Sequence, residues 1–210
     1  MTNHISDEVS SKPMVLIDGG WLLHRMRWKK VASFGEIVDS YVSYIEKRFD
    51  LTTVIFDGYE KSTIKDNEHE RRSSAKVSAT MTPKPDMWAP ENQDAFLSNA
   101  NNKTQLIKML AKHLEKNHSV QISEGDADIL LVKEAMNFAR NAQSVTVVAD
   151  DTDIFVLLVH HWKQGMASVY LHMEGRTTKK EQSRLYDIKE ACGIITPAQK
   201  DNILFIHAWP

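Results

Sequence analysis

The stretch SVTVVADDTD, residues 144–153, joins a run of β-branched residues to a cluster of acids. Its first half has no charged residue, which is typical of a strand that is buried on both faces of a sheet. Such a strand needs helices on both faces, and here it ends directly in carboxylates. The stretch therefore predicts an α/β domain with a central, mostly parallel sheet flanked by helices.

Three further predicted strands end in acids or lead into them. They are residues 14–17 with Asp18, residues 52–56 with Asp57, and residues 119–123 with Asp126 and Asp128. Helical patterns separate the strands, and one of these begins with the capping-box spacing Ser33-x-x-Glu36. Strands that alternate with helices in this way are typical of βαβ units.

The end of the chain predicts one more strand and two helices. The strand covers residues 167–172, a polar turn follows at 175–180, and the helices cover 186–192 and 196–208. Residues 154–162 fit either a buried helix or a strand.

Residues 59–102 differ in composition from the rest of the chain. They contain few large apolar residues and three of the six prolines, which predicts a long insertion outside the core. Residues 1–13 form a polar N-terminal tail, and residues 14–210 form a single domain.

Charge and cysteine content narrow the class of protein. The chain has 26 Lys and Arg against 28 Asp and Glu, a net charge of −2. Its single cysteine, Cys192, excludes an internal disulfide and argues against a zinc or iron–sulfur centre. No segment has the ~18 apolar residues of a membrane span, and the polar N-terminus lacks a secretory signal. We therefore expect an intracellular protein, nuclear or cytoplasmic, with no membrane partner.

The acids at the strand ends are the candidate site, because the carboxyl ends of parallel strands open onto one edge of the sheet. Carboxylates so close together repel unless a cation binds them, and oxygen ligands suit Mg²⁺ or Mn²⁺. Two such ions promote hydrolysis of a phosphodiester, which predicts nucleic acid as substrate. Outside the seven acids, 21 acids stand against 26 cations, a net charge of +5 that suits a polyanion. The predicted metal ligands are Asp18, Asp57, Asp126, Asp128, Asp150, Asp151 and Asp153.

Each acid also has a structural explanation. Asp-Gly after a strand is a turn signal, the acids at 126 and 128 open a helix and suit its N-terminus, and residues 150–153 fit a solvated turn. These explanations do not account for acids, with hardly any Lys or Arg among them, at all four strand ends.

The four motifs, in the order IDG, FDG, GDAD and DDTD, resemble those of the flap endonuclease group of structure-specific 5′ nucleases, within the PIN-like nuclease fold. The resemblance runs from Met14 to the C-terminus. It implies a three-layer PIN-like domain and a Mg²⁺-dependent nuclease with a two-metal-ion mechanism. Asp150 would be an accessory acid. The catalytic, metal-holding acids would be Asp18, Asp57, Asp126, Asp128, Asp151 and Asp153.

The resemblance also assigns roles outside the acids. Residues 59–102 fall where that family has a flexible helical arch, and Lys65, Arg71 and Arg72 match the spacing of its basic residues that bind the substrate phosphate. The alternative for these three is an exposed helix turn with i,i+3 ion pairs. The family continues into a Gly-x-Asp and a helix-turn-helix that holds duplex DNA, whereas this chain stops at Pro210. This difference suggests a fragment, a truncated reading frame, or a protein that takes the duplex-binding element from a protein partner.

The predicted activity is hydrolysis of DNA or structured nucleic acid with free or flapped 5′ ends, with DNA favoured over RNA. A PIN-type ribonuclease is the first alternative, because it uses a similar acid site with less need of an arch. A degenerate module that binds nucleic acid or protein and a small-molecule phosphoesterase are the others. Trp21 and Trp28 lie among cations just after Asp18, where they suit either stacking on bases or packing of a helix on the sheet.

Overall fold

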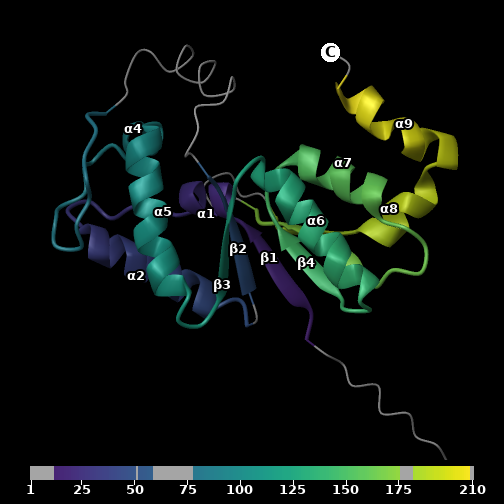
Figure 1. Ribbon diagram of the computed structural model, residues 1–210, viewed down its shortest axis with the longest axis horizontal. Helices are drawn as coiled ribbons and strands as arrows, with labels where there is room; N and C mark the ends of the chain where they lie inside the picture. Colours follow the sequence, from purple (N-terminus) through teal and green to yellow (C-terminus); the bar gives the residue numbers. More distant parts are fainter. Residues whose placement is uncertain (1–11, 51, 59–77, 176–181, 209–210) are drawn as a thin grey trace, which may run out of the picture.

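The computed structural model describes residues 12–50, 52–58, 78–175 and 182–208, with side chains as far as residue 204. Its centre is a six-stranded sheet in the order β3-β2-β1-β4-β5-β6 (Figure 1). Neighbouring strands pair in parallel, except that β6 is antiparallel to β5. The strands are β1 (Met14–Asp18), β2 (Thr52–Asp57), β3 (Ser119–Ser123), β4 (Val145–Val148), β5 (Val169–Met173) and β6 (Arg184–Asp187).

Helices cover both faces of the sheet and make a three-layer domain, as the sequence predicts. Helices α1, α2, α4 and α5 pack on one face, and α6 to α9 lie on the other (Figure 1). They are α1 (Gly19–Arg25), α2 (Phe34–Glu46), α4 (Gln93–Leu97), α5 (Ala100–Leu114), α6 (Ala127–Arg140), α7 (Thr152–His161), α8 (Ile188–Ile194) and α9 (Pro197–Ala208).

Alternating side chains of the central strands supply two separate cores. Ile17 of β1 and Phe56 of β2 pack with α2 and α5, whereas Leu16 and Ile55 pack with α6 and α7. Successive side chains of a strand point to opposite faces, so a strand with helices on both sides must be apolar throughout. This requirement explains why the apolar runs identify the central strands.

The capping box predicted at Ser33 and Glu36 is present at the start of α2. The Glu36 backbone N–H donates to Ser33 Oγ at 3.2 Å, and the Ser33 N–H donates to Glu36 Oε2 at 2.7 Å. These two bonds satisfy N–H groups that have no partner within the helix. They fix where α2 begins.

Residues 78–102 are part of the core, which corrects the prediction that the whole segment 59–102 lies outside it. Phe96 and Leu97 of α4 are buried. The backbone N–H of Gly35 donates to a carbonyl of this segment, Pro85 O, at 2.9 Å. The polar composition was misleading because a few buried apolar side chains are enough to join the segment to the core, although Trp88 is exposed. Residues 59–77, the rest of the predicted arch-like insertion at 59–102, are outside the described residues.

The C-terminal part contains a strand where a helix was predicted. Residues 184–187 form β6, so α8 begins at Ile188 rather than at Tyr186. Strands β5 and β6 are antiparallel neighbours. This pairing favours a hairpin over a crossover, the two connections that the polar turn at 175–180 left open. Residues 154–162, for which helix and strand were both open, lie in α7 and its C-cap. No helix in the described residues is long and apolar enough to cross a membrane.

The close approach of α1 to β2 requires glycine at position 19. A Cβ there would lie 2.7 Å from the Ile55 carbonyl oxygen and closer still to the Phe56 ring. We expect Gly19→Ala to lower the free energy of unfolding by about 2 kcal/mol, because the buried ring and the strand cannot both move away. Urea denaturation measures this change.

Gly193→Ala in α8 is the matched control, since no described atom lies within 4 Å of the added Cβ. Alanine should be neutral or stabilising at that helical position, by up to ~1 kcal/mol. Equal stability of the two variants would show that α1 does not pack tightly on β2.

Candidate functional site

The carboxyl ends of β1, β2 and β4 lie at the same edge of the sheet. Asp18 pairs with Ile55, and Ile17 pairs with Val148, so the three strands end nearly level. Asp57 is the last residue of β2. The loops that leave this edge carry the predicted acids, as expected for a ligand-binding edge of a parallel sheet.

Three of the acids are N-caps of helices. Asp18 caps α1, Asp126 caps α6 and Asp151 caps α7. Each accepts a hydrogen bond from the backbone N–H two residues further on, at 2.8, 3.0 and 2.8 Å respectively. The capping explanation, which was made for Asp126 and Asp128, is confirmed for Asp126, while Asp128 lies in the first turn of α6. Asp18 and Asp151, for which a turn was the structural alternative, are helix caps as well. Because a carboxylate has two oxygens, capping by one of them is compatible with a ligand role.

Asp57 is held by a different element. Its Oδ1 accepts a hydrogen bond from the Ala127 backbone N–H at 3.2 Å, so the end of β2 is tied to the first residue of α6. The α6 N-terminus carries partial positive charge, which stabilises a carboxylate placed there.

Asp128 lies among the other acids. Burial is the largest cause that raises its pKa, which reaches about 7, and the negative charges of four carboxylates raise it further. These four, in decreasing order of effect, are Asp18, Asp126, Asp151 and Asp57. The structure therefore brings five of the seven predicted acids into one cluster, which we call the acid cluster.

The pKa of Asp18 is raised as well. Burial raises its pKa, hydrogen bonds from the backbone N–H groups of Trp21 and Gly20 lower it in part, and the charge of Asp57 raises it again. The helix start thus stabilises a charge that the buried position disfavours.

Two further predicted acids flank Asp151, and three predicted cations lie outside the described residues. Asp150, Asp151 and Asp153 are all exposed. The predicted phosphate-binding residues Lys65, Arg71 and Arg72 lie outside the described residues, so their role stays a prediction.

Sequence reasoning missed one cation in the site, Lys103. This half-buried lysine lies in the first turn of α5. Burial lowers its pKa, and the charges of Asp57 and Asp18 raise it in part. No spacing in the sequence links it to these acids, because only the packing of α5 beside the strand ends brings it there.

The acid cluster has the donor chemistry of a divalent-cation site, since hard ions prefer carboxylate oxygens. A cation would also relieve the repulsion that raises the pKa of Asp128. Within the described ranges, however, no three His, Cys, Asp or Glu side chains lie close enough together to hold an ion. The carboxylates would therefore have to move closer together when an ion binds.

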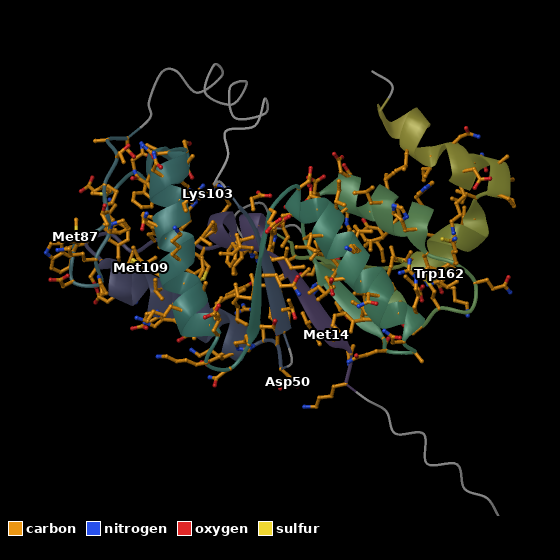
Figure 2. All side chains as sticks on the ribbon, in the orientation of Figure 1. Met14, Asp50, Met87, Lys103, Met109 and Trp162 are labelled. Carbon is orange, nitrogen blue, oxygen red and sulfur yellow. The ribbon has the colours of Figure 1, made fainter. Side chains whose placement is uncertain are left out.

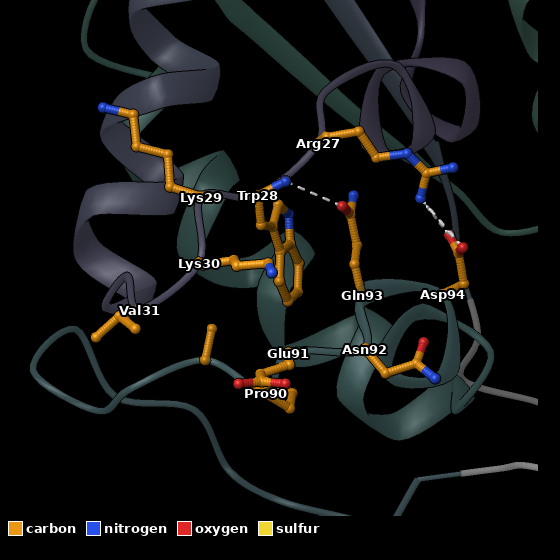
Figure 3. A pocket seen from close by; sticks show the side chains of 11 residues that line it. Arg27, Trp28, Lys29, Lys30, Val31, Pro90, Glu91, Asn92, Gln93 and Asp94 are labelled. Carbon is orange, nitrogen blue, oxygen red and sulfur yellow. Dashed lines mark hydrogen bonds and ion pairs between the residues drawn. The ribbon is translucent and has the colours of Figure 1, made fainter.

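A separate cavity of about 410 Å³ lies between the loop after α1 and the start of α4 (Figure 3). Arg27 at this cavity is paired with Asp94 at 3.1 Å. The Trp28 backbone N–H donates to Gln93, and its ring nitrogen donates to Tyr41 Oη, each at 3.1 Å. The packing explanation therefore holds for Trp28, which links α1 to α2 and α4.

A family model, described as the NYN domain, matches residues 12–192. The chain belongs to the NYN domain family. The NYN match covers all six strands, and the predicted PIN-like α/β fold is confirmed. No curated protein matches the chain.

Solved structures similar to this NYN domain are nucleases of low sequence identity. A mutant T5 5′-exonuclease is 14% identical, with a TM-score of 0.43 over 82% of this chain and 52% of that chain. The bacteriophage T5 D15 protein with metal ions is 15% identical, with a TM-score of 0.45 over 82% and 56%. The Holliday junction-resolving enzyme GEN1, in complex with product DNA and Mg²⁺, is 9% identical, with a TM-score of 0.40 over 86% and 34%. The chain spans about half the length of the T5 nucleases.

The raised pKa of Asp128 predicts a fold that loses stability as the pH rises. Aspartate has an ordinary pKa of 3.8, whereas that of Asp128 in the fold is about 7, so the folded state binds the extra proton between these values. At pH 8 without metal, Asp128→Asn should therefore unfold at higher urea than the wild type, by on the order of 1 kcal/mol after solvent screening.

At pH 4 the carboxyl is neutral in the fold, and the difference between Asp128→Asn and the wild type should become small. Asp39→Asn, at an exposed position of α2, is the control and should follow the wild type at both pH values. Equal stabilities of Asp128→Asn and the wild type at pH 8 in EDTA would show that the carboxylates do not repel.

Proposed function

We propose that the acid cluster is the active site of a divalent-metal-dependent nuclease that cleaves RNA. The observation that carries the proposal is the convergence of five carboxylates from four strand ends, Asp128 and the four whose charges act on it. Membership of the NYN family, a PIN-like ribonuclease family, supports it independently.

Family membership also bears on the choice of substrate. The motifs alone favour flapped DNA, on their resemblance to flap endonucleases. The NYN match favours the ribonuclease alternative instead, so the proposal takes RNA as substrate and keeps flapped DNA as the competing substrate of the test.

Four carboxylates are the best candidates to hold a metal ion. They come from three neighbouring strand ends and from the start of α6, and they are Asp18, Asp57, Asp128 and Asp151. A bound Mg²⁺ or Mn²⁺ supplies Lewis-acid chemistry: it lowers the pKa of water and neutralises charge on the phosphate.

The protein itself fixes the positions of the charged carboxylates. The N-terminal N–H groups of α1 and α7 fix one oxygen of Asp18 and of Asp151, so these ligands lose little freedom on binding a cation. Asp128 holds a proton up to about pH 7. A cation must displace that proton, so binding should strengthen as the pH rises through this range.

A second candidate function is a degenerate module that binds nucleic acid without cleaving it. The observation in its favour is that no three ligating side chains in the described residues are already assembled for an ion. If neither Mg²⁺ nor Mn²⁺ supports cleavage or raises the melting temperature, this function is correct.

The test of the proposed function compares single-stranded RNA with 5′-flapped DNA of the same sequence, with Mn²⁺, with Mg²⁺ and with EDTA. We expect cleavage of RNA that EDTA abolishes. Faster cleavage of the flapped DNA would restore the flap-endonuclease function, and cleavage in EDTA would exclude the metal-dependent mechanism.

Asp151→Asn should lower the rate of RNA cleavage by on the order of 100-fold, because it removes a charge that holds the cation. Asparagine still caps a helix, so α7 and the melting temperature should be preserved. Single-turnover cleavage and thermal unfolding measure the two effects.

Asp187→Asn is the matched control. Asp187 caps α8 with the same kind of bond, to the Lys189 N–H at 2.8 Å. Strand β6 is antiparallel, so it ends at the opposite edge of the sheet, where Asp187 pairs with Tyr170 near the start of β5. Equal loss of activity in both variants would mean that helix capping, not the acid cluster, controls the rate.

A further inference from the structure

Trp88 is an exposed aromatic side chain that neither the fold nor the proposed chemistry uses. It is 65% exposed, and it belongs to neither of the two cores formed by the described residues. Trp28, by contrast, packs edge-on against Phe96, with ring centroids 5.3 Å apart. Figure 2 labels Met87, the residue before Trp88, at the outer edge of the domain. The Trp88 ring is therefore accessible to a ligand.

Backbone pairing holds Trp88 in place. Ser33 pairs with Trp88 in an antiparallel bridge, and beside this bridge the Phe34 N–H donates to the Met87 carbonyl oxygen at 2.9 Å. The loop after α1 is thereby joined to the segment that leads into α4. A side chain on a fixed backbone loses less freedom when it binds a ligand than one on an unpaired loop, which favours binding.

The same loop has a strained residue at the cavity between α1 and α4. Val31 lies in the left-handed region, with a φ of 55°, and its side chain is 77% exposed. A β-branched residue rarely adopts this conformation, and such strain is concentrated at functional sites. Val31 and Ala89 both line the cavity of about 410 Å³, a volume typical of small-molecule sites. Because Ala89 follows Trp88 directly, Trp88 lies at the border of this cavity.

The charged residues that line the cavity are three cations and two acids. Arg27 is paired with Asp94, as the dashed line in Figure 3 shows. Lys29 and Lys30 are exposed, and neither forms an ion pair with any residue that the structure describes. Glu91 is the remaining acid. The cavity therefore has a net positive charge and two lysines that can bind an anion.

We propose that Trp88, Lys29 and Lys30 form a second contact site for single-stranded RNA, outside the acid cluster. An unpaired base would stack on the Trp88 ring, and the two ammonium groups would bind the adjoining phosphates. Proteins bind single strands with this combination, because stacking accepts any base and cations follow the backbone. The inference rests on the proposed function, in that it concerns the same substrate.

Helix α1 links this contact site to the acid cluster. Asp18 caps the start of α1, and the loop that lines the cavity leaves its other end. The seven residues of α1 span about 10 Å. One single strand can therefore contact both places. A duplex cannot use Trp88 in this way, because its bases are stacked on one another, so the contact site would select unpaired substrate.

A protein partner is the other ligand that an exposed tryptophan suits, since tryptophan is frequent among the residues that contribute most to protein interfaces. The two lysines favour RNA, because lysine is depleted in protein interfaces but is a common phosphate ligand.

The test measures binding of a short, unstructured, fluorescein-labelled RNA to the full chain by fluorescence anisotropy, in EDTA so that metal-dependent cleavage does not occur. Trp88→Leu, which keeps an apolar side chain but removes the flat ring, should weaken binding about ten-fold. Trp88→Phe, which keeps a ring, should retain most of the affinity. Duplex RNA of the same sequence should bind the wild type and Trp88→Leu equally.

The lysines are tested by their salt dependence. Lys29→Gln combined with Lys30→Gln should reduce the slope of log affinity against log salt concentration by about 1.4, because each phosphate contact on a single strand contributes about 0.7. Trp88→Leu should leave this slope unchanged, since stacking releases no counterion.

Two exposed residues elsewhere provide matched controls. Ile194→Ala, at the end of α8, controls for the loss of an exposed apolar side chain, and Lys108→Gln, on α5, controls for the loss of a lysine. Both should bind the single-stranded RNA as the wild type does. Thermal unfolding of each variant shows that the fold is intact.

Two outcomes overturn the inference. One is that the wild type does not bind the single-stranded RNA. The other is that Trp88→Leu and the double lysine variant bind it as tightly as the wild type, which leaves Trp88 to a protein partner. The fate of the proposed nuclease is read separately. Weaker binding in Trp88→Leu, without RNA cleavage by the wild type in Mg²⁺ or Mn²⁺, supports the contact site and removes the nuclease function. Metal-dependent RNA cleavage with unchanged affinity in Trp88→Leu does the reverse.

Discussion

Repulsion among carboxylates at one edge of a parallel sheet is the constraint on which the rest of this structure depends. Parallel pairing of β1 with β2 and β4 brings Asp18, Asp57 and Asp151 to the same edge. The fold offsets the repulsion with groups of opposite polarity: the N-termini of α1, α6 and α7, and the ammonium of Lys103. Asp128 lies among these acids, and burial together with the remaining repulsion raises its pKa.

Helix capping and metal binding are therefore compatible explanations of the acids. An N-cap needs one carboxylate oxygen, and a metal ion needs another. The helices start where they do because Asp18, Asp126 and Asp151 accept backbone N–H groups, and the same bonds hold these side chains at the site. What capping alone does not explain is Asp128, which caps no helix and is half-buried among like charges.

The sequence predicted most of the sheet and the acid cluster because both depend on local signals. Apolar runs mark strands buried on both faces, and the acids follow them directly. Three features depended on tertiary contacts and were missed. Residues 78–102 pack on α1 and α2 in spite of their polar composition, and β6 forms only because β5 offers it an edge. Lys103 reaches the acids through the placement of α5, which no sequence spacing encodes.

The same electrostatics connects stability with function. Carboxylates that do not repel one another gain little free energy when a cation binds them. Carboxylates whose repulsion is not offset gain more, because the cation neutralises their charge. The charge of Lys103 offsets part of the repulsion at Asp57 and Asp18, whereas the charges of four carboxylates still raise the pKa of Asp128. Under the proposed function, a divalent cation would therefore gain most free energy near Asp128, where the repulsion among the carboxylates is least relieved.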